Sequence, residues 1–140
     1  MSVRLSFDAQ EQQLDVIHDY LAQSYWSPGI PRATVERAIA NSIVVGAFED
    51  GAQLGFARVV SDRATFAYLA DVFVLEPHRG RGIARAMIEA LHAHPELQGL
   101  RRWALFTRDM QPLYARLGWT PYPHPPERLM VREDDEVYSR

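Results

Sequence analysis

Two glycines flanked by arginines stand at the start of an expected helix, in the stretch HRGRGIARAM at residues 78–87. Glycine is costly inside a helix, but it leaves the backbone bare where another group must approach closely. The first amides of a helix have no partner within it, and the helix dipole makes that end positive. Gly80 and Gly82, with Arg79 and Arg81 beside them, therefore predict a site for a phosphate or pyrophosphate.

Two familiar phosphate-binding loops do not match this glycine turn. A Walker loop places Lys and then Ser or Thr after its last glycine, whereas Ile83 and Ala84 follow Gly82. A dinucleotide-binding fingerprint needs three glycines early in a parallel strand–helix–strand unit. The remaining alternative for this stretch alone is a basic surface turn whose glycines reverse the chain.

Asp71 is an acid in the middle of an apolar stretch, TFAYLADVFVLE at residues 65–76. This stretch predicts a central strand buried on both faces, in which alternation puts Asp71 on the same side as Leu69 and Phe73. A carboxylate in such a place is expected to be paired or functional, because an unpaired buried charge is costly. Two roles stay open: a base or substrate-binding group, and an ion pair with Arg58 or Arg108.

Hydrophobic periodicity and turn residues predict the elements that must position these groups. Asp50-Gly51 is a hairpin signal, and Pro31 suits the first turn of a second helix that carries Val35 inward. The predicted order is β-α-α-β-β-β-α-β-α-β, an α/β fold with a mixed sheet. Its strands lie at about 3–7, 42–49, 52–60, 65–76, 101–107 and, as a last edge strand, 128–132; its helices lie at about 9–23, from 31, 82–94 and 110–118.

The composition limits the classes of function. The chain has 140 residues, about one domain, and is 47% hydrophobic, which is enough for a core. A net charge of -3 argues against nucleic-acid binding through Arg79, Arg81, Arg85, Arg101 and Arg102. Cysteine is absent, which excludes disulfides and a cysteine nucleophile. The sequence has no signal peptide or membrane-length apolar run, so a cytoplasmic protein is expected.

Two separated motifs resemble those of the GCN5-related N-acetyltransferase (GNAT) family. Arg79-x-x-Gly82-x-Ala84, after DVFVLEP, is similar to the motif that binds the acetyl-CoA pyrophosphate. LYARLGW, at residues 113–119, is similar to the family segment LYxxxGF. The element order also matches, so the resemblance covers most of residues 3–131. Family members often carry Asn seven residues before the motif tyrosine, where this chain has Thr107.

The resemblance implies one GNAT-like domain over residues 1–140, with a mostly antiparallel sheet flanked by helices. It also implies acetyl transfer from acetyl-CoA to an amine of a small molecule or peptide. Phe73 and Val74 would pair with the pantetheine arm, and an amide there would polarise the thioester carbonyl. The pyrophosphate would be held by the backbone amides of Arg79, Gly80, Arg81, Gly82, Ile83 and Ala84.

Tyr114 would lie near the sulfur and protonate the leaving thiolate, as the family position implies. Its alternative role is a core tyrosine with a satisfied hydroxyl. Because no cysteine can carry the acetyl group, direct attack in a ternary complex is preferred. No residues have metal-ligand spacing, and His92 and His94 are expected to be solvated residues at a helix end.

The loop SYWSPGIP, at residues 24–31, carries Tyr25 and Trp26 between the first two helices. In the GNAT fold this connection often borders the acceptor site, and exposed aromatic side chains on a loop favour binding. Tyr68 is expected to line the same cleft. Alternatively, Trp26 packs down and anchors the loop.

Two other functions compete with the acetyltransferase. One is a catalytically silent CoA-binding or sensing domain of the same fold, and the other, which the net charge disfavours, is the nucleic-acid binder. A homodimer is compatible with the sequence, which gives it no specific support. The sequence identifies neither the acceptor amine nor the general base.

Overall fold

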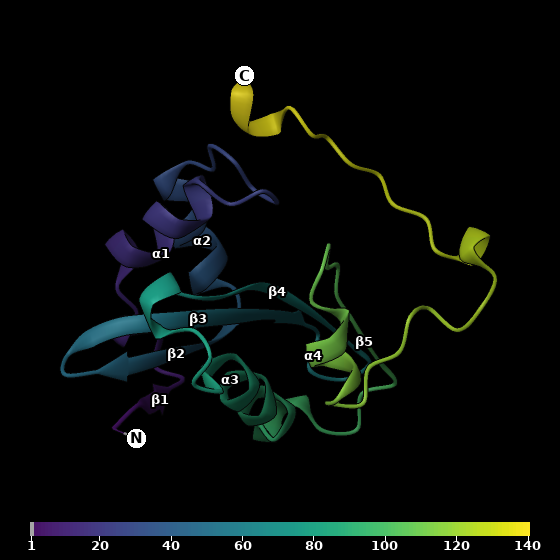
Figure 1. Cartoon of the computed structure of the whole chain (residues 1–140). Coiled ribbons are helices and arrows are strands. Elements are labelled where there is room, and N and C mark those ends of the chain that lie inside the picture. Colours follow the sequence, from purple (N-terminus) through teal and green to yellow (C-terminus); the bar gives the residue numbers. More distant parts are fainter. Residues whose placement is uncertain (1) are drawn as a thin grey trace.

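A five-stranded sheet, whose strand order follows the chain, forms the centre of the computed structural model, which describes residues 2–140 (Figure 1). The four antiparallel neighbours are β1 (Arg4–Ser6), β2 (Ile43–Glu49), β3 (Ala52–Ser61) and β4 (Phe66–Val74). The fifth strand, β5 (Arg102–Ala104), pairs with β4 in parallel. The predicted α/β fold with a mixed, mostly antiparallel sheet is therefore confirmed.

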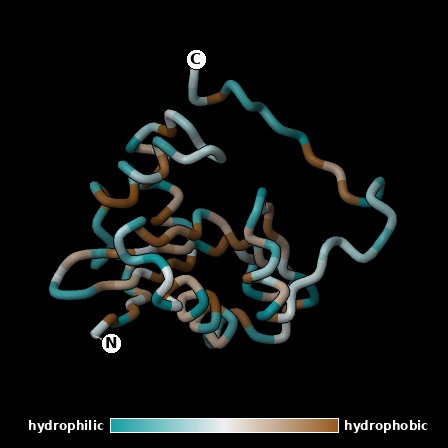
Figure 2. The backbone as a smooth tube through the Cα atoms, in the orientation of Figure 1, coloured by the Kyte–Doolittle hydropathy of each residue, from teal (hydrophilic) through white to brown (hydrophobic). Residues whose placement is uncertain are grey.

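Helices lie on both faces of this sheet and divide the core into two clusters (Figure 1). The first pair is α1 (Leu14–Ala22) and α2 (Arg32–Ala40), and the second pair is α3 (Ile83–His92) and α4 (Gln111–Ala115). Ile17 and Val35 of the first pair pack against Phe56 of the sheet, whereas Met87 of α3 packs against Val59. In Figure 2 the apolar colour accordingly concentrates along the sheet and the helix sides that face it.

The hairpin between β2 and β3 turns at Asp50 and Gly51, whose φ angles are 53° and 79°. Two positive φ angles match the tight hairpin turn that the Asp-Gly signal predicts.

A bulge in β4 changes the side on which its residues lie. Phe56 pairs with Phe73, but Arg58 pairs with Ala70, so an extra residue is accommodated in β4. Asp71 lies at this irregularity with φ 56°, in the left-handed region. Leu69 consequently packs with α3 and Phe73 packs with α1 and α2. The expectation that Asp71, Leu69 and Phe73 share one side is wrong, because the bulge interrupts the alternation.

The pairing between β4 and β5 is short. It ends at Tyr68 and Ala104, while β4 continues to Val74. The second half of β4 therefore has no strand beside it on the β5 side, although the Val74 carbonyl oxygen accepts a hydrogen bond from Arg79 Nε.

Two predicted elements differ in the structure. The expected helix at 9–23 is divided into a 3-10 turn, Ala9–Glu11, and α1, which starts at Leu14. The expected edge strand at 128–132 is wrong, because residues 120–140, called here the C-terminal arm, leave the sheet edge after α4 (Figure 1). The prolines at residues 121–127 cannot donate backbone hydrogen bonds to an edge, and they direct the chain away.

The remaining regular segments are short 3-10 turns at Glu76–His78, Pro95–Leu97, Pro126–Arg128 and Val137–Ser139. Among residues 2–140, no helix has the length and apolar character needed to cross a membrane.

Candidate active site

The glycine turn before α3 is open toward solvent. Gly80 has φ 80° and Gly82, the residue that caps α3, has φ 77°. No atom lies within 4 Å of the position that a Cβ would take at either residue, and no side chain caps the helix. The glycines are therefore required by backbone conformation, and the first amides of α3 face free space. This arrangement fits a pyrophosphate.

The two arginines of the turn bind other parts of the protein. Arg79 donates from Nε to the Val74 carbonyl oxygen at 2.9 Å and from Nη2 to the Tyr20 hydroxyl at 3.0 Å. Arg81 donates to the Glu49 carboxylate at 2.7 Å, and this hydrogen bond lowers the pKa of Glu49. Both side chains thus fix the turn to the sheet and α1. Arg81 is not among the residues that line the cleft.

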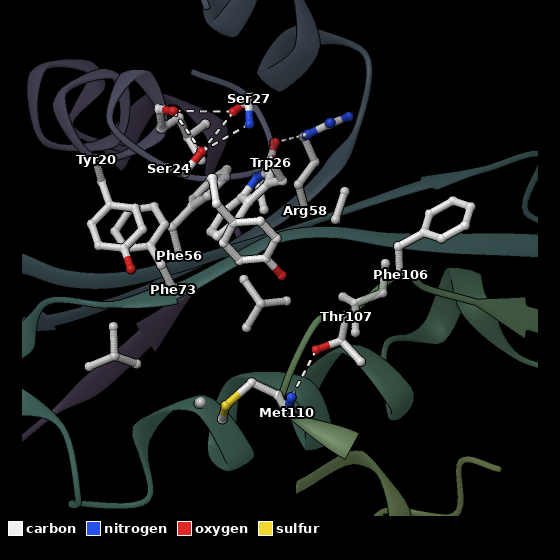
Figure 3. A pocket seen from close by; sticks show the side chains of 18 of the residues that line it. Tyr20, Ser24, Trp26, Ser27, Phe56, Arg58, Phe73, Phe106, Thr107 and Met110 are labelled. Carbon is white, nitrogen blue, oxygen red and sulfur yellow. Dashed lines mark hydrogen bonds and ion pairs between the residues drawn. The ribbon is translucent and has the colours of Figure 1, made fainter. Parts of the chain in front are cut away.

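A cleft of about 1470 Å³ extends from this turn, past the second half of β4, to the loop after α1. Figure 3 shows part of it, with Trp26 and Arg58 on one side and Thr107 and Met110 on the other. The structure brings together twelve of the thirteen predicted site residues along this cleft, all except Arg81. They are Tyr25, Trp26, Tyr68, Asp71, Phe73, Val74, Arg79, Gly80, Gly82, Ile83, Ala84 and Tyr114.

Tyr114 has a buried ring and an unpaired hydroxyl. Its side chain is 8% exposed and packs edge-on against Trp119, with ring centroids 5.9 Å apart. No hydrogen bond of this hydroxyl is formed within residues 2–140, and since no fully buried side-chain oxygen there lacks a partner, the hydroxyl is accessible from the cleft. Burial, helped by the nearby Tyr25, raises the pKa of Tyr114 to about 12. At neutral pH the phenol is therefore protonated and available as a donor.

The local sequence explains why α4 presents Tyr114 there. The Thr107 hydroxyl accepts a hydrogen bond from the Met110 amide at 3.0 Å just before the helix. Gly118, with φ 94°, terminates the segment in the left-handed region. Thr107, which stands where the family often has Asn, thus stabilises the start of α4.

Asp71 joins the acceptor-side loop to the sheet. Its Oδ2 accepts from Arg58 Nε at 2.9 Å, and its Oδ1 accepts from Trp26 Nε1 at 2.9 Å (Figure 3). Arg58 also donates to the Ser42 hydroxyl at 3.2 Å. Of the two roles left open for Asp71, the ion pair with Arg58 is present in the structure. The indole contact shows that Trp26 anchors its loop while its half-exposed ring still lines the cleft.

The rest of this loop is held by contacts across the cleft mouth. The guanidinium of Arg108 lies 3.9 Å from the centre of the Tyr25 ring, and the Arg108 amide donates to the Tyr25 hydroxyl at 3.1 Å. The buried hydroxyls of Ser24 and Ser27 lie 3.0 Å apart, within hydrogen-bonding distance. These contacts give Tyr25 and Trp26 a defined position.

Several cleft residues were missed by the sequence reasoning, among them three aromatic ones. Phe106 packs edge-on to Tyr68, with centroids 6.0 Å apart, and alternation after β5 could have indicated its side. Tyr20 stacks on Phe73 at 4.1 Å, in line with its helical spacing. Tyr138 reaches the cleft from the C-terminal arm, and no local signal pointed to it.

Burial and the nearby Asp71 carboxylate raise the pKa of Tyr68, so this cleft phenol is also neutral at physiological pH. Within residues 2–140, no cluster of three or more His, Asp or Glu side chains is arranged to hold a metal ion.

The mostly antiparallel sheet, the glycine turn and the cleft beside β4 define the class of acetyltransferases that the motifs indicated. The sequence model described as "Acetyltransferase (GNAT) domain" matches residues 40–121. A Gibberella zeae protein named as an acetyltransferase is 30% identical over 142 residues, covering 84% of this chain and 79% of that protein. The chain therefore belongs to the GNAT family and is an acetyltransferase.

Solved structures agree with this assignment. A GNAT-family protein of Xanthomonas campestris pv. campestris is 51% identical and superposes with a TM-score of 0.94, covering 99% of this chain and 97% of that one. A Clostridium acetobutylicum protein, described as a predicted acetyltransferase and solved with acetyl-CoA, is 14% identical with a TM-score of 0.66, covering 93% and 94%. The second likeness concerns the fold alone.

Proposed function

We propose that the protein moves an acetyl group from acetyl-CoA to the amine of a small molecule or peptide, by direct attack in a ternary complex. One observation carries the proposal: a single cleft joins the open start of α3, the unpaired half of β4 and the free hydroxyl of Tyr114. Bound acetyl-CoA supplies the activated thioester.

The cofactor end of the cleft uses backbone groups. The amides from Arg79 to Ala84 hold the pyrophosphate, because the glycines leave room for it and no side chain competes for the helix start. The side of β4 that lacks a β5 partner, at Phe73 and Val74, pairs with the pantetheine amides, for which the Val74 carbonyl oxygen would have to be shared with Arg79 Nε. A β4 amide there stabilises the oxyanion that forms at the thioester carbonyl.

Tyr114 stabilises the departing sulfur as a hydrogen-bond donor. Its pKa of about 12 lies well above the ~8.5 of an ordinary thiol, so complete proton transfer from the phenol to the thiolate is unfavourable. A thiolate is a tolerable leaving group, and a donated hydrogen bond lowers its energy as charge develops. The proton that the thiolate finally takes then comes from water.

The acceptor end uses Tyr25, Trp26, Tyr68 and Asp71. An alkylamine has a pKa near ~10.4 and must lose a proton before it attacks. Asp71 already accepts from Arg58 and Trp26, and its remaining lone pairs can accept an N–H of the incoming amine. We therefore assign Asp71 to substrate binding, and the amine proton leaves through water in the open cleft.

Two of the five arginines on which the nucleic-acid alternative rested have acidic partners. Arg81 is bound to Glu49, and Arg85 lies 3.3 Å from Glu89. Those two charges are thus neutralised locally. The silent CoA-binding alternative predicts binding without turnover, so an activity measurement separates it from the enzyme.

The test compares wild-type protein with Gly82→Val, which places a branched side chain where the phosphates would lie and strains a positive φ. Gly51→Val is the matched control, because Gly51 has φ 79° and equally open surroundings, yet lies in the β2–β3 turn. CoA affinity, measured by calorimetry, should fall at least about tenfold in Gly82→Val alone, a change of roughly 1.4 kcal/mol. Equal affinity in a folded Gly82→Val protein would refute the pyrophosphate assignment.

Turnover is measured as free-CoA release from acetyl-CoA with a panel of amines. Release that depends on an amine and falls in Gly82→Val supports the proposed reaction. Tight CoA binding without release for any amine in the panel would favour the silent domain.

A further inference from the structure

Two opposite charges lie at the acceptor end of the cleft, with two aromatic rings between them. Trp26 Nε1 donates to the Asp71 carboxylate at 2.9 Å, and the Trp26 ring packs edge-on against Tyr25, with centroids 5.1 Å apart. The guanidinium of Arg108 lies 3.9 Å from the centre of the Tyr25 ring. All four residues line the cleft. A carboxylate and a guanidinium are thus joined by a continuous series of contacts.

Arg108 is held in place but has little to neutralise its charge. Its amide donates to the Tyr25 hydroxyl at 3.1 Å, and its guanidinium lies over the same ring. Within residues 2–140, the one carboxylate within 4.0 Å of that guanidinium belongs to Asp109, and the two side chains are 65% and 63% exposed. An ion pair between such exposed side chains contributes little. A guanidinium stacked on a ring can still offer its N–H edge to a carboxylate through two parallel hydrogen bonds.

The other arginine at this end of the cleft, Arg58, is already occupied. Its side chain is 18% exposed, and its Nε donates to the Asp71 carboxylate at 2.9 Å. It also donates from Nη1 to the Ser42 hydroxyl at 3.2 Å. Arg58 therefore compensates the charge of Asp71, and Arg108 is left as the cation that a ligand can pair with.

The surface between the two charges suits an apolar body. Tyr25 and Trp26 are 49% and 39% exposed. Phe106, which packs edge-on to Tyr68, is 61% exposed, and Figure 3 shows it across the cleft from Trp26. Exposed aromatic rings that line a cleft bind apolar or planar groups.

We propose that the acceptor amine also carries a carboxylate, as a free amino acid or a short peptide does. The inference rests on the proposed acetyl transfer and names the class of its acceptor. The amine donates to Asp71, the apolar body lies on Trp26 and Tyr25, and the carboxylate binds the guanidinium of Arg108. Arg108 is then a residue that determines specificity, because it contacts the acceptor away from the reacting nitrogen.

The test compares matched acceptors in the assay of free-CoA release. Free tryptophan and phenylalanine, and glycine dipeptides that end in them, are each supplied as the acid and as the C-terminal amide, so the panel also distinguishes amino acids from peptides. Wild-type protein should give the higher kcat/KM with the acid. Arg108→Gln should lower the acid-to-amide ratio of kcat/KM about tenfold, because charge-assisted hydrogen bonds are lost. Intrinsic differences between the two amines cancel, since both proteins are tested with the same pair.

Two further variants separate recognition of the carboxylate from a structural effect. Arg37→Gln is the matched control, because Arg37 is also exposed but lies on α2 outside the cleft lining, and it should keep the wild-type ratio. Arg108→Lys keeps the charge without the planar fork, so it should retain part of the preference. If Arg108→Gln merely displaces the loop that carries Tyr25, kcat/KM falls equally for acids and amides, and an unchanged ratio overturns the proposal.

The outcomes distinguish this inference from the proposed function. Turnover of amines with no preference for the acid, or with a preference that Arg108→Gln does not change, overturns the carboxylate assignment and leaves the acetyl transfer standing. A kcat/KM for phosphoethanolamine above that of every carboxylate in the panel would also overturn it, in favour of a phosphate. Absence of CoA release with every amine, neutral or acidic, refutes the proposed function and this inference with it.

Discussion

The hydroxyl of Tyr114 is a donor held in a buried ring with no partner of its own. The hydroxyl borders the cleft, where it can meet a ligand. We therefore expect Tyr114→Phe to lower kcat about 10²-fold, the low end of the ~10²–10³ range for loss of one preorganised hydrogen-bond donor, since a thiolate leaves readily unaided. Calorimetry and thermal melting should give nearly unchanged CoA affinity and melting temperature. Retained kcat, with chemistry shown to be rate-limiting, would exclude the donor role, and a large loss of stability would favour a structural one.

Ionisation of Tyr114 gives a second observable. Burial raises its pKa from ~10 to about 12, so the folded state favours the protonated phenol. The corresponding stabilisation is complete below pH ~10 and is lost as the pH rises toward the folded value. The ultraviolet absorbance of tyrosinate is recorded as the pH is raised, for wild-type protein and for Tyr114→Phe. The difference between the two titrations should therefore show one phenol that ionises with a midpoint well above pH 10. A midpoint at the ordinary value would mean that the hydroxyl is solvated.

Asp71 shows where prediction at the scale of a residue succeeded and where it failed. An acid in an apolar strand had to be paired or functional, and Arg58, one of the two proposed partners, is its ion-pair partner. The prediction of the sheet face on which Asp71 lies was wrong, because the bulge arises from the pairing of β4 with β3. No local pattern in the sequence reports such a register change.

At the scale of elements, the loop at residues 24–31 is fastened to the sheet through one indole N–H. Trp26→Ala should raise the KM for the acceptor amine about tenfold or more, since a hydrogen bond to a carboxylate is lost, and should raise the acetyl-CoA KM less. Trp26→Phe, which keeps a ring and removes the N–H, should show part of the same effect. Steady-state kinetics in which the concentrations of both substrates are varied give the two KM values. If the acetyl-CoA KM rises and the acceptor KM does not, the loop has been assigned to the wrong end of the cleft.

The end of α3 is coupled to the segment after α4 through His92. The expectation of a solvated His92 is wrong, because its ring packs between Trp103 and Trp119, and Trp119 donates to His92 Nε2 at 3.2 Å. A helix pattern alone cannot show that two later tryptophans cover this position. Burial lowers the pKa of His92, so the folded state favours the neutral ring.

The resulting pH dependence has a definite sign. A lowered histidine pKa contributes stability above the unfolded value of ~6.5, and this contribution is lost as the pH falls through the folded value. Urea unfolding of wild-type protein should therefore give a lower free energy at pH 5 than at pH 7.5. The decrease should be smaller in His92→Asn and unchanged in His94→Asn. If the free energy of unfolding decreases equally in all three proteins, groups other than His92 cause the pH dependence.

At the scale of the whole molecule, the elements with local signals were the predictable ones. The Asp50-Gly51 hairpin, the glycine turn and the amphipathic α3 are each specified by neighbouring residues. The short β4–β5 pairing and the C-terminal arm depend on contacts between distant segments, so residues 128–132 were expected to be a strand and instead lie exposed. The part of the cleft that the two family motifs form, the glycine turn and the segment around Tyr114, was predictable from the motifs; the rest of its lining comes from elements outside them.

The sheet order that follows the chain order shapes how a nascent chain can assemble on the ribosome. As β2, β3 and β4 emerge, each finds the preceding strand already made, so the antiparallel part of the sheet can form as synthesis proceeds. The parallel strand β5 must wait until α3 has been made and has crossed the sheet. The cleft, which needs β4, α3 and α4 together, is therefore the last part to be completed. An incomplete chain that ends before β5 can have an ordered meander while still lacking the site.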